Sequence, residues 1–151
     1  KWLEIDCRSP QTLIELKKIS KIPIVTGETI MELINIKDFI DQNCIDYISI
    51  DLPWTGLTES LKISNYFKKK NYDITTHNYN GYLGTLMSAN LAAMIPNFLI
   101  GEIDFDEAEG VEEIFNIKPS INGRYLKVPS EPGWGCELNE KKINKFYSAK
   151  S

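Results

Sequence analysis

The stretch IDYISID, residues 45–51, has the pattern of a β-strand that ends in a carboxylate. Ile48 and Ile50 fall on one face of such a strand, whereas Tyr47, Ser49 and Asp51 fall on the other. The same design recurs along the chain, because an acidic or imidazole side chain closes each of five apolar, strand-like runs. These five side chains are Glu4, Glu28, Asp51, His77 and Glu102.

The five polar positions are almost evenly spaced, at intervals of 24, 23, 26 and 25 residues. Each interval holds one strand, one helix and two loops, so the spacing predicts consecutive βα units, right-handed crossovers and a parallel sheet. The ends of the strands in a parallel α/β barrel converge on one face, where such folds carry their chemistry. We therefore expect the five polar side chains to share one pocket.

The apolar periodicity predicts the elements between these positions. Strands are expected over residues 2–6, 24–28, 45–51, 72–77 and 98–103. Helices are expected over residues 12–18, 34–43, 58–70 and 83–95, with residues 53–56 as a turn and Thr58 as an N-cap. Met87 and Met94 recur at helical spacing, which favours core packing over a cofactor role.

The regular spacing stops after Asp104. We divide the chain into a partial (β/α) barrel, residues 1–104, and an extension, residues 105–151, that packs on the barrel. Within the extension, Asn122-Gly123 is a hairpin turn signal and Asn139 is expected to cap a short helix. No low-complexity linker separates the two parts.

Composition limits the classes of protein. The 151 residues are 42% hydrophobic and 25% charged, which is typical of one ordinary domain, and a net charge of −4 gives no reason to expect nucleic acid. No apolar run approaches the roughly 20 residues of a membrane span, and no signal-peptide layout is present. Three cysteines without a CxxC pair indicate a reducing cytoplasm. Because Lys1 directly precedes a strand-like run, the sequence is expected to be either a trimmed chain or a fragment.

The residue types at the strand ends suggest a chemistry. Glu4 and Glu28 would lie at neighbouring strand ends and present the hard oxygen ligands that suit Mg²⁺. Asp51 and His77 would lie on the next two strands, where a carboxylate fixes the tautomer of an imidazole and raises its basicity. Glu102, if protonated among other carboxylates, could donate a hydrogen bond to a developing oxyanion.

The ordered series of motifs resembles the barrel domain of the enolase superfamily. The motifs are WLE at 2–4, PIVTGE at 23–28, Asp51 with GLTE at 56–59, His77, Pro96-Asn97 with EID at 102–104, and PGWG at 132–135. More narrowly, they resemble the mandelate racemase/muconate lactonizing enzyme family, in its mandelate racemase subgroup with the acid-sugar dehydratases. The resemblance covers nearly the whole chain and implies strands four to eight of the family barrel, followed by the extension.

The resemblance also implies roles for the five strand-end residues. Glu4 and Glu28 match carboxylates that bind Mg²⁺, Asp51 and His77 match a catalytic dyad, and Glu102 matches the acid of the last strand. An aspartate in place of a lysine at the sixth strand end favours the racemase-like subgroup. The implied reaction is Mg²⁺-dependent removal of the proton α to a carboxylate, most simply in the dehydration of an acid sugar. Trp54, Asn78 and Tyr79 would then meet substrate hydroxyls.

This sequence also departs from the family pattern. It does not contain the amino-terminal capping domain or the first three barrel strands, and with them go a third metal-binding carboxylate and a lysine base. It also has Ile5-Asp6 where relatives usually have a second acid and then a proline. Five strands cannot close an eight-stranded barrel, so strands 2–6 and 98–103 should have open edges. We expect an amino-terminal half or a homo-oligomer partner to cover them.

Three other functions remain open at this level. Reprotonation on the opposite face would make the protein a racemase or epimerase of a 2-hydroxy acid. An inactive half-barrel or assembly element is also compatible with the sequence. An open flavodoxin-like sheet that binds a small ligand is a further alternative, although the chain lacks a glycine-rich phosphate loop.

Overall fold

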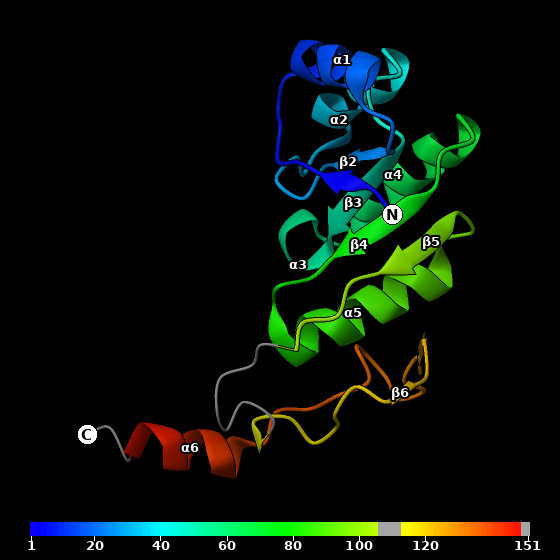
Figure 1. Ribbon diagram of the computed structural model, residues 1–151. Helices are drawn as coiled ribbons and strands as arrows, with labels where there is room; N and C mark the ends of the chain where they lie inside the picture. The colour runs from blue at the N-terminus through cyan, green and yellow to red at the C-terminus, as the bar shows by residue number, and fades with distance from the viewer. Residues whose placement is uncertain (106–112, 149–151) are drawn as a thin grey trace.

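The computed structural model describes residues 1–105 and 113–148 and contains a parallel five-stranded sheet (Figure 1). The strand order β1-β2-β3-β4-β5 follows the chain, and every neighbouring pair is parallel. The strands are β1 (Leu3–Glu4), β2 (Ile24–Thr26), β3 (Tyr47–Asp51), β4 (Ile74–His77) and β5 (Phe98–Gly101). The fold is therefore α/β, as the even spacing of polar strand ends predicts.

Helices connect successive strands and lie against the sheet (Figure 1). They are α1 (Pro10–Ile19), α2 (Leu33–Asp41), α3 (Leu52–Thr55), α4 (Leu57–Lys69) and α5 (Gly81–Met94). The start of α1 shows why the chain becomes helical there. The Ser9 side chain accepts a hydrogen bond from the backbone N–H of Thr12, and Pro10 occupies the first turn, where it has no backbone N–H to leave unpaired.

The core lies between one face of the sheet and the helices. Its strand residues include Ile24, Ile48 and Ile74. Ile48 of β3 is the register partner of Ile74 of β4, whereas Ile24 of β2 pairs with Leu3 of β1. The helices contribute buried side chains to the same cluster: Leu13, Ile36, Phe39, Ile40, Ile63, Phe67 and Leu91. The opposite face of β3 and β4 carries Ser49 and Thr75 and then, at the strand ends, Asp51 and His77.

Three local predictions are wrong. Residues 52–55 form the one-turn helix α3, not a turn, because the Asp51 side chain accepts a hydrogen bond from the N–H of Trp54. Gly56, not Thr58, occupies the N-cap position of α4. Met87 packs against the core, but Met94 at the end of α5 is 49% exposed.

The extension contains the two elements that its turn and cap signals predict. A two-stranded antiparallel hairpin joins β6 (Ile121–Asn122) to β7 (Tyr125–Leu126), and α6 (Glu140–Ser148) begins directly after Asn139. The Asn139 side chain accepts a hydrogen bond from the N–H of Lys142. Trp134 packs against the core of the sheet. Residues 106–112 and 149–151 lie outside the described residues, and the division near Asp104 stays a prediction.

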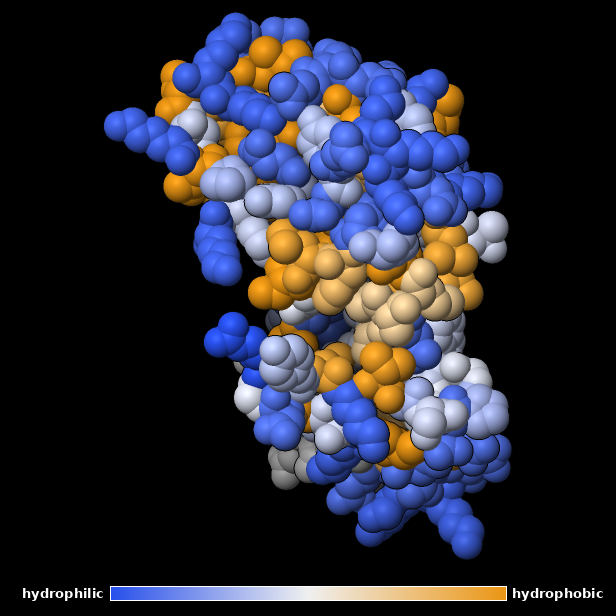
Figure 2. All heavy atoms as spheres, turned by 90° about the vertical axis from the view of Figure 1, so that its right-hand side faces the viewer, coloured by the Kyte–Doolittle hydropathy of each residue, from blue (hydrophilic) through white to orange (hydrophobic). Residues whose placement is uncertain are grey.

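The last strand of the sheet is unusually open. All four residues of β5 are exposed, and the exposed fractions of Phe98, Leu99 and Ile100 are 36%, 44% and 46%. Within the described residues, β1 and β5 each pair with one strand only. Figure 2 shows apolar side chains gathered across the middle of one face, between hydrophilic ends. Among the described helices, none is long and apolar enough to cross a membrane.

The exposed β5 strand predicts that the isolated 151-residue chain self-associates. An apolar edge strand presents unpaired backbone groups and apolar side chains to a second molecule. We expect light scattering to show species larger than a monomer, and Ile100→Lys to shift the distribution toward the monomer. Ile19→Lys, at a 78% exposed position on α1, should not do so. A monodisperse, cooperatively melting wild-type monomer would contradict this expectation.

Burial also predicts how the three free cysteines differ in reactivity. Cys44 is fully buried, and burial raises the pKa of its thiol to about 11, whereas Cys7 and Cys136 are partly exposed. Because the thiolate is the reactive form, Cys44 should be modified far more slowly than the other two. A thiol reagent at mildly alkaline pH should modify two cysteines rapidly in the native chain and all three after denaturation. Rapid modification of Cys44 in the native chain, located by mass spectrometry, would show that its burial is transient.

Candidate active site

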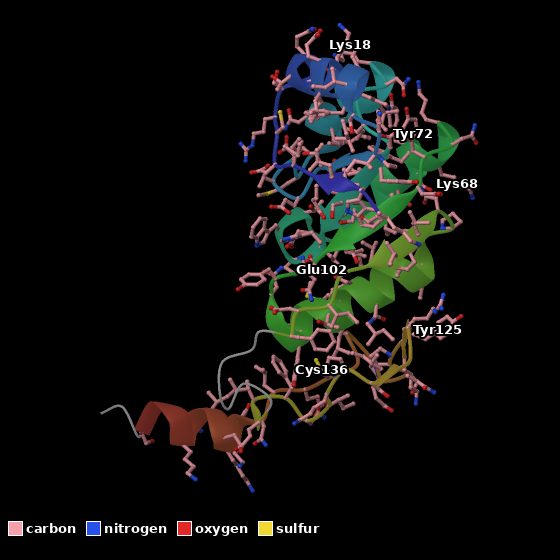
Figure 3. All side chains as sticks on the ribbon, viewed as in Figure 1. Lys18, Lys68, Tyr72, Glu102, Tyr125 and Cys136 are labelled. Atoms are coloured by element: carbon pink, nitrogen blue, oxygen red, sulfur yellow. The ribbon has the colours of Figure 1, made fainter. Side chains whose placement is uncertain are left out.

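The parallel register brings the predicted residues together at the carboxyl ends of the strands. Asp51 of β3 and His77 of β4 are direct register partners. Glu102 follows β5, and its backbone N–H donates to the carbonyl of Thr76, one residue before His77. Figure 3 shows Glu102 between α3 and the start of α5, whereas Lys68 and Tyr72 lie at the opposite end of the sheet. The strand-end prediction therefore places these side chains correctly.

Asp51 and His77 form a close pair. The Nδ1 atom of His77 lies 2.9 Å from Oδ2 of Asp51, and the carboxylate is fully buried. The other oxygen of Asp51, Oδ1, accepts a hydrogen bond of 3.0 Å from the N–H of Trp54. The same carboxylate thus starts α3 and orients the imidazole. An imidazole held in this way presents Nε2 as the atom able to accept a proton.

Two further carboxylates face the free side of the His77 ring. Nε2 of His77 lies 3.2 Å from Oε2 of Glu28 and 3.9 Å from Oε2 of Glu102. Burial of the ring opposes protonation, but the hydrogen bond with Asp51 and the two nearby glutamates outweigh it. The net effect raises the pKa of His77 above its ordinary value of 6.5.

The loop after β2 brings Glu28 to this position. Gly27 has a φ of 128°, and a Cβ atom there would lie 2.6 Å from Cγ1 of Ile48. Only glycine fits this conformation and this close approach, so the glycine before the carboxylate is a local requirement. Partial burial raises the pKa of Glu28, and the nearby negative charges of Asp6, Glu4 and Glu102 raise it further, against the opposing effect of His77.

Glu4 lies on the edge strand and is exposed. Its Oε2 accepts a hydrogen bond of 3.2 Å from the indole N–H of Trp2. Among residues 1–105 and 113–148, no group of three His, Cys, Asp or Glu side chains is close enough to hold a metal ion. Glu4 and Glu28 nevertheless have the hard oxygen donors that Mg²⁺ requires, and their charges interact. The described residues thus include two carboxylates of the type that ligate Mg²⁺, without a third ligand beside them.

The three predicted substrate contacts have different surroundings. Trp54 is 47% exposed and its ring centroid lies 5.9 Å from that of His77, and Tyr79 is 70% exposed. Asn78 is fully buried, and its Nδ2 donates a hydrogen bond of 2.8 Å to Oγ1 of Thr85. We do not extend the substrate prediction to Asn78, because its side chain is occupied inside the loop.

Four of the five predicted side chains form one cluster, and the shared pocket stays a prediction. Glu28, Asp51 and Glu102 all approach His77, whereas Glu4 contacts Trp2. A cavity of about 670 Å³ is lined by residues of the loops after β1 and β2 and by α2, and none of the five lines it.

The sequence reasoning overlooked Asn80 and Asp104. Asn80 Nδ2 donates a hydrogen bond of 2.7 Å to Oδ2 of Asp51, and Oδ2 of Asp104 accepts one of 3.1 Å from the N–H of Gly81. Asn80-Gly81 precedes an apolar helical pattern and is typical of an ordinary helix start. The sequence therefore does not indicate a hydrogen bond between Asn80 and Asp51.

The family comparison agrees with this geometry. Residues 1–142 match the Enolase C-terminal domain-like family, and this chain belongs to that family.

Named relatives and a solved structure show the same likeness. The chain is 28% identical over 118 residues to a D-xylonate dehydratase of Haloferax volcanii, covering 78% of this chain and 29% of that protein. An arabinonate dehydratase of Saccharolobus solfataricus is 25% identical over 121 residues, covering 80% and 32% of the two chains. A Burkholderia xenovorans structure, named as an L-alanine-DL-glutamate epimerase, superposes with a TM-score of 0.91 at 35% identity, covering 95% of this chain and 37% of that one.

The chain spans about a third of the length of the curated relatives that it matches. The Burkholderia protein has also been crystallised with magnesium and fumarate. These relatives are enzymes, so the cluster around His77 lies in a domain of an enzyme superfamily.

Proposed function

We propose that this chain supplies the catalytic base of an active site that acts on acid sugars. The base removes the proton α to the carboxylate, and the substrate then loses water. The observation that supports this most directly is the Asp51–His77 pair, with Nε2 of His77 directed toward two carboxylates. The dehydratases among the relatives favour an acid sugar as the substrate class.

We assign Glu4 and Glu28 as two ligands of a Mg²⁺ ion, which when bound stabilises the negative charge that develops on the substrate carboxylate. His77 Nε2 accepts the α-proton, because Asp51 holds the proton of the neutral ring on Nδ1. His77 then delivers a proton to the departing hydroxyl. Glu102 Oε2 is held by the backbone N–H of Asn78 at 2.8 Å, which fixes the carboxyl group beside the reacting atoms. Trp54 and Tyr79 contact the sugar.

A second candidate is epimerisation or racemisation of a 2-hydroxy acid. The likeness to a protein named as an epimerase, at 35% identity, favours it. The two reactions share the proton-removal step and differ in whether a hydroxyl leaves.

We also propose that the protein acts in the cytoplasm. All three cysteines are free thiols, which is typical of a reducing compartment.

Supplying the amino-terminal half of a relative, such as the Haloferax D-xylonate dehydratase, tests the proposal. We expect the mixture to convert at least one of xylonate, arabinonate, gluconate or galactonate to a 2-keto-3-deoxy acid when Mg²⁺ is present, and not when a chelator removes it. Exchange of the α-hydrogen with D₂O without a keto product would favour epimerisation. No product and no exchange with several partner halves would favour an inactive half-barrel.

A further inference from the structure

Asn80 lies at the N-terminus of α5 but does not cap it. It is the N-cap residue of the helix, a position at which an asparagine side chain ordinarily accepts a hydrogen bond from the first turn. Here the side chain makes no such bond, and Asp104 accepts from the N–H of Gly81 instead. The amide of Asn80 is therefore directed elsewhere, at the expense of a local helix-capping bond.

The amide of Asn80 reaches the carboxylate that orients His77. Its Nδ2 lies 2.7 Å from Oδ2 of Asp51, the same oxygen that faces Nδ1 of His77. An ionised carboxylate only accepts, so the amide must present its NH₂ group here. A fully buried carboxylate requires donors, and the described residues supply Asp51 with three: the N–H of Trp54, the amide of Asn80 and the imidazole of His77.

The loop itself holds Asn80 in place. Asn80 N–H donates to Oδ1 of Asn78 at 3.3 Å, and Asn78 is in turn held by Thr85. Gly84 leaves room for this arrangement, because a Cβ atom there would lie 2.4 Å from Oδ1 of Asn78 and 2.6 Å from Cβ of Asn80. The loop between β4 and α5 is thus packed around the two asparagines.

We propose that Asn80 is a positioning residue that keeps Asp51 oriented toward Nδ1 of His77, so that Nε2 is the nitrogen of the neutral ring that accepts a proton. The amide of Asn80 and the ring of His77 share Oδ2 of Asp51, at 2.7 Å and 2.9 Å, so the amide is one of the contacts that fix this oxygen beside Nδ1. If Nε2 carried the proton, the ring could not act as the base of the proposed reaction. By holding Asp51 in place, Asn80 keeps an acceptor beside Nδ1 and so keeps the proton of the neutral ring on that nitrogen. This inference rests on the proposed function.

The tautomer of His77 can be measured without any activity, because His77 is the only histidine in the chain. In ¹⁵N-histidine-labelled protein, above the pH at which the ring is protonated, the two nitrogen shifts give the ratio of Nδ1–H to Nε2–H forms. Asn80→Ala should shift this ratio measurably toward Nε2–H, because an Asp51 carboxylate that is no longer held can turn away from Nδ1. Asn80→Leu, close in shape but without a donor, should do the same.

Asn90→Ala is the matched control. Asn90 lies on α5, where its Nδ2 donates to the carbonyls of Leu86 and Trp134, so its truncation costs amide hydrogen bonds on the same helix and leaves the bonds to Asp51 intact. In Asn90→Ala, the tautomer ratio of His77 should equal that of the wild type. Circular dichroism should show that all variants are folded. An unchanged ratio in both Asn80 variants, or an equal shift in Asn90→Ala, would overturn the inference.

Activity provides the second arm of the experiment. In the Mg²⁺-dependent mixture, Asn80→Ala should lower kcat with little change in KM, whereas Asn90→Ala should leave both near wild type. If no variant is active but the tautomer ratio shifts, Asn80 still positions Asp51 and only the proposed function fails. If the wild type is active and Asn80→Ala retains its kcat, the positioning role is wrong.

Discussion

Asparagine in place of His77 should lower acid-sugar turnover by about 10²- to 10⁴-fold, the usual contribution of a positioned general base. Asparagine is close in shape to the δ side of the imidazole and can still donate to Asp51, but it cannot accept the α-proton. Exchange of the α-hydrogen with D₂O should fall by the same factor, because that exchange needs only the proton-removal step. Both rates are to be measured in the Mg²⁺-dependent mixture.

Lys68→Ala is the control for the His77 variant. Lys68 lies at the opposite end of the sheet (Figure 3), so its loss should leave turnover within about twofold, in keeping with the small effects of surface changes. Retention of most of the activity by His77→Asn, with a normal circular dichroism spectrum, would remove His77 from the mechanism and leave the other strand-end groups to supply the base.

Ile63→Ala should strongly destabilise the fold. Ile63 is 1% exposed and belongs to the core between α4 and the sheet, so its truncation removes packing and leaves a cavity. We expect a loss of about 2–5 kcal/mol in the free energy of unfolding. At about 2–4 °C per kcal/mol for a chain of this size, thermal melting should show a clear downward shift of Tm.

Ile19→Ala provides the same chemical change at a 78% exposed helical position. Its effect should stay within about 0.5 kcal/mol, because little apolar surface leaves a packed environment. Both variants are to be compared at one protein concentration, since self-association makes the melting temperature depend on concentration. Equal shifts for the two variants would mean that α4 does not pack on the sheet as described.

The carboxyl ends of β3 and β4 show what the periodicity of the sequence predicts correctly. The alternation in residues 45–51 correctly separates Ile48 and Ile50 from Ser49 and Asp51, since strand geometry assigns successive side chains to opposite faces. The regular interval to His77 then predicts that the two ends meet, because a βα unit returns the chain to the adjacent parallel strand.

Local contacts explain the errors. Thr58 looks like an N-cap by residue type, but Asp51 begins a helix seven residues earlier and Gly56 separates it from α4. Met94 fits the helical pattern of its neighbours, yet its side chain is 49% exposed on the last turn of α5, although Ile95 next to it still belongs to the core. Asn78 follows His77 directly, and its Nδ2 donates to Oγ1 of Thr85 within the loop, so a role for Asn78 in substrate binding stays a prediction.

The order of the strands, their parallel pairing and the identity of the polar group at each strand end follow from the sequence by itself, because they depend on alternation and spacing along one chain. Only the tertiary structure decides that Glu28 reaches Nε2 of His77, that Glu4 contacts Trp2 instead, and that Asn80 donates to Asp51. Those pairings depend on loop conformations and side-chain directions, which the periodicity of the sequence does not encode. Apart from Glu4 and Trp2, the paired residues also lie more than twenty residues apart in the chain.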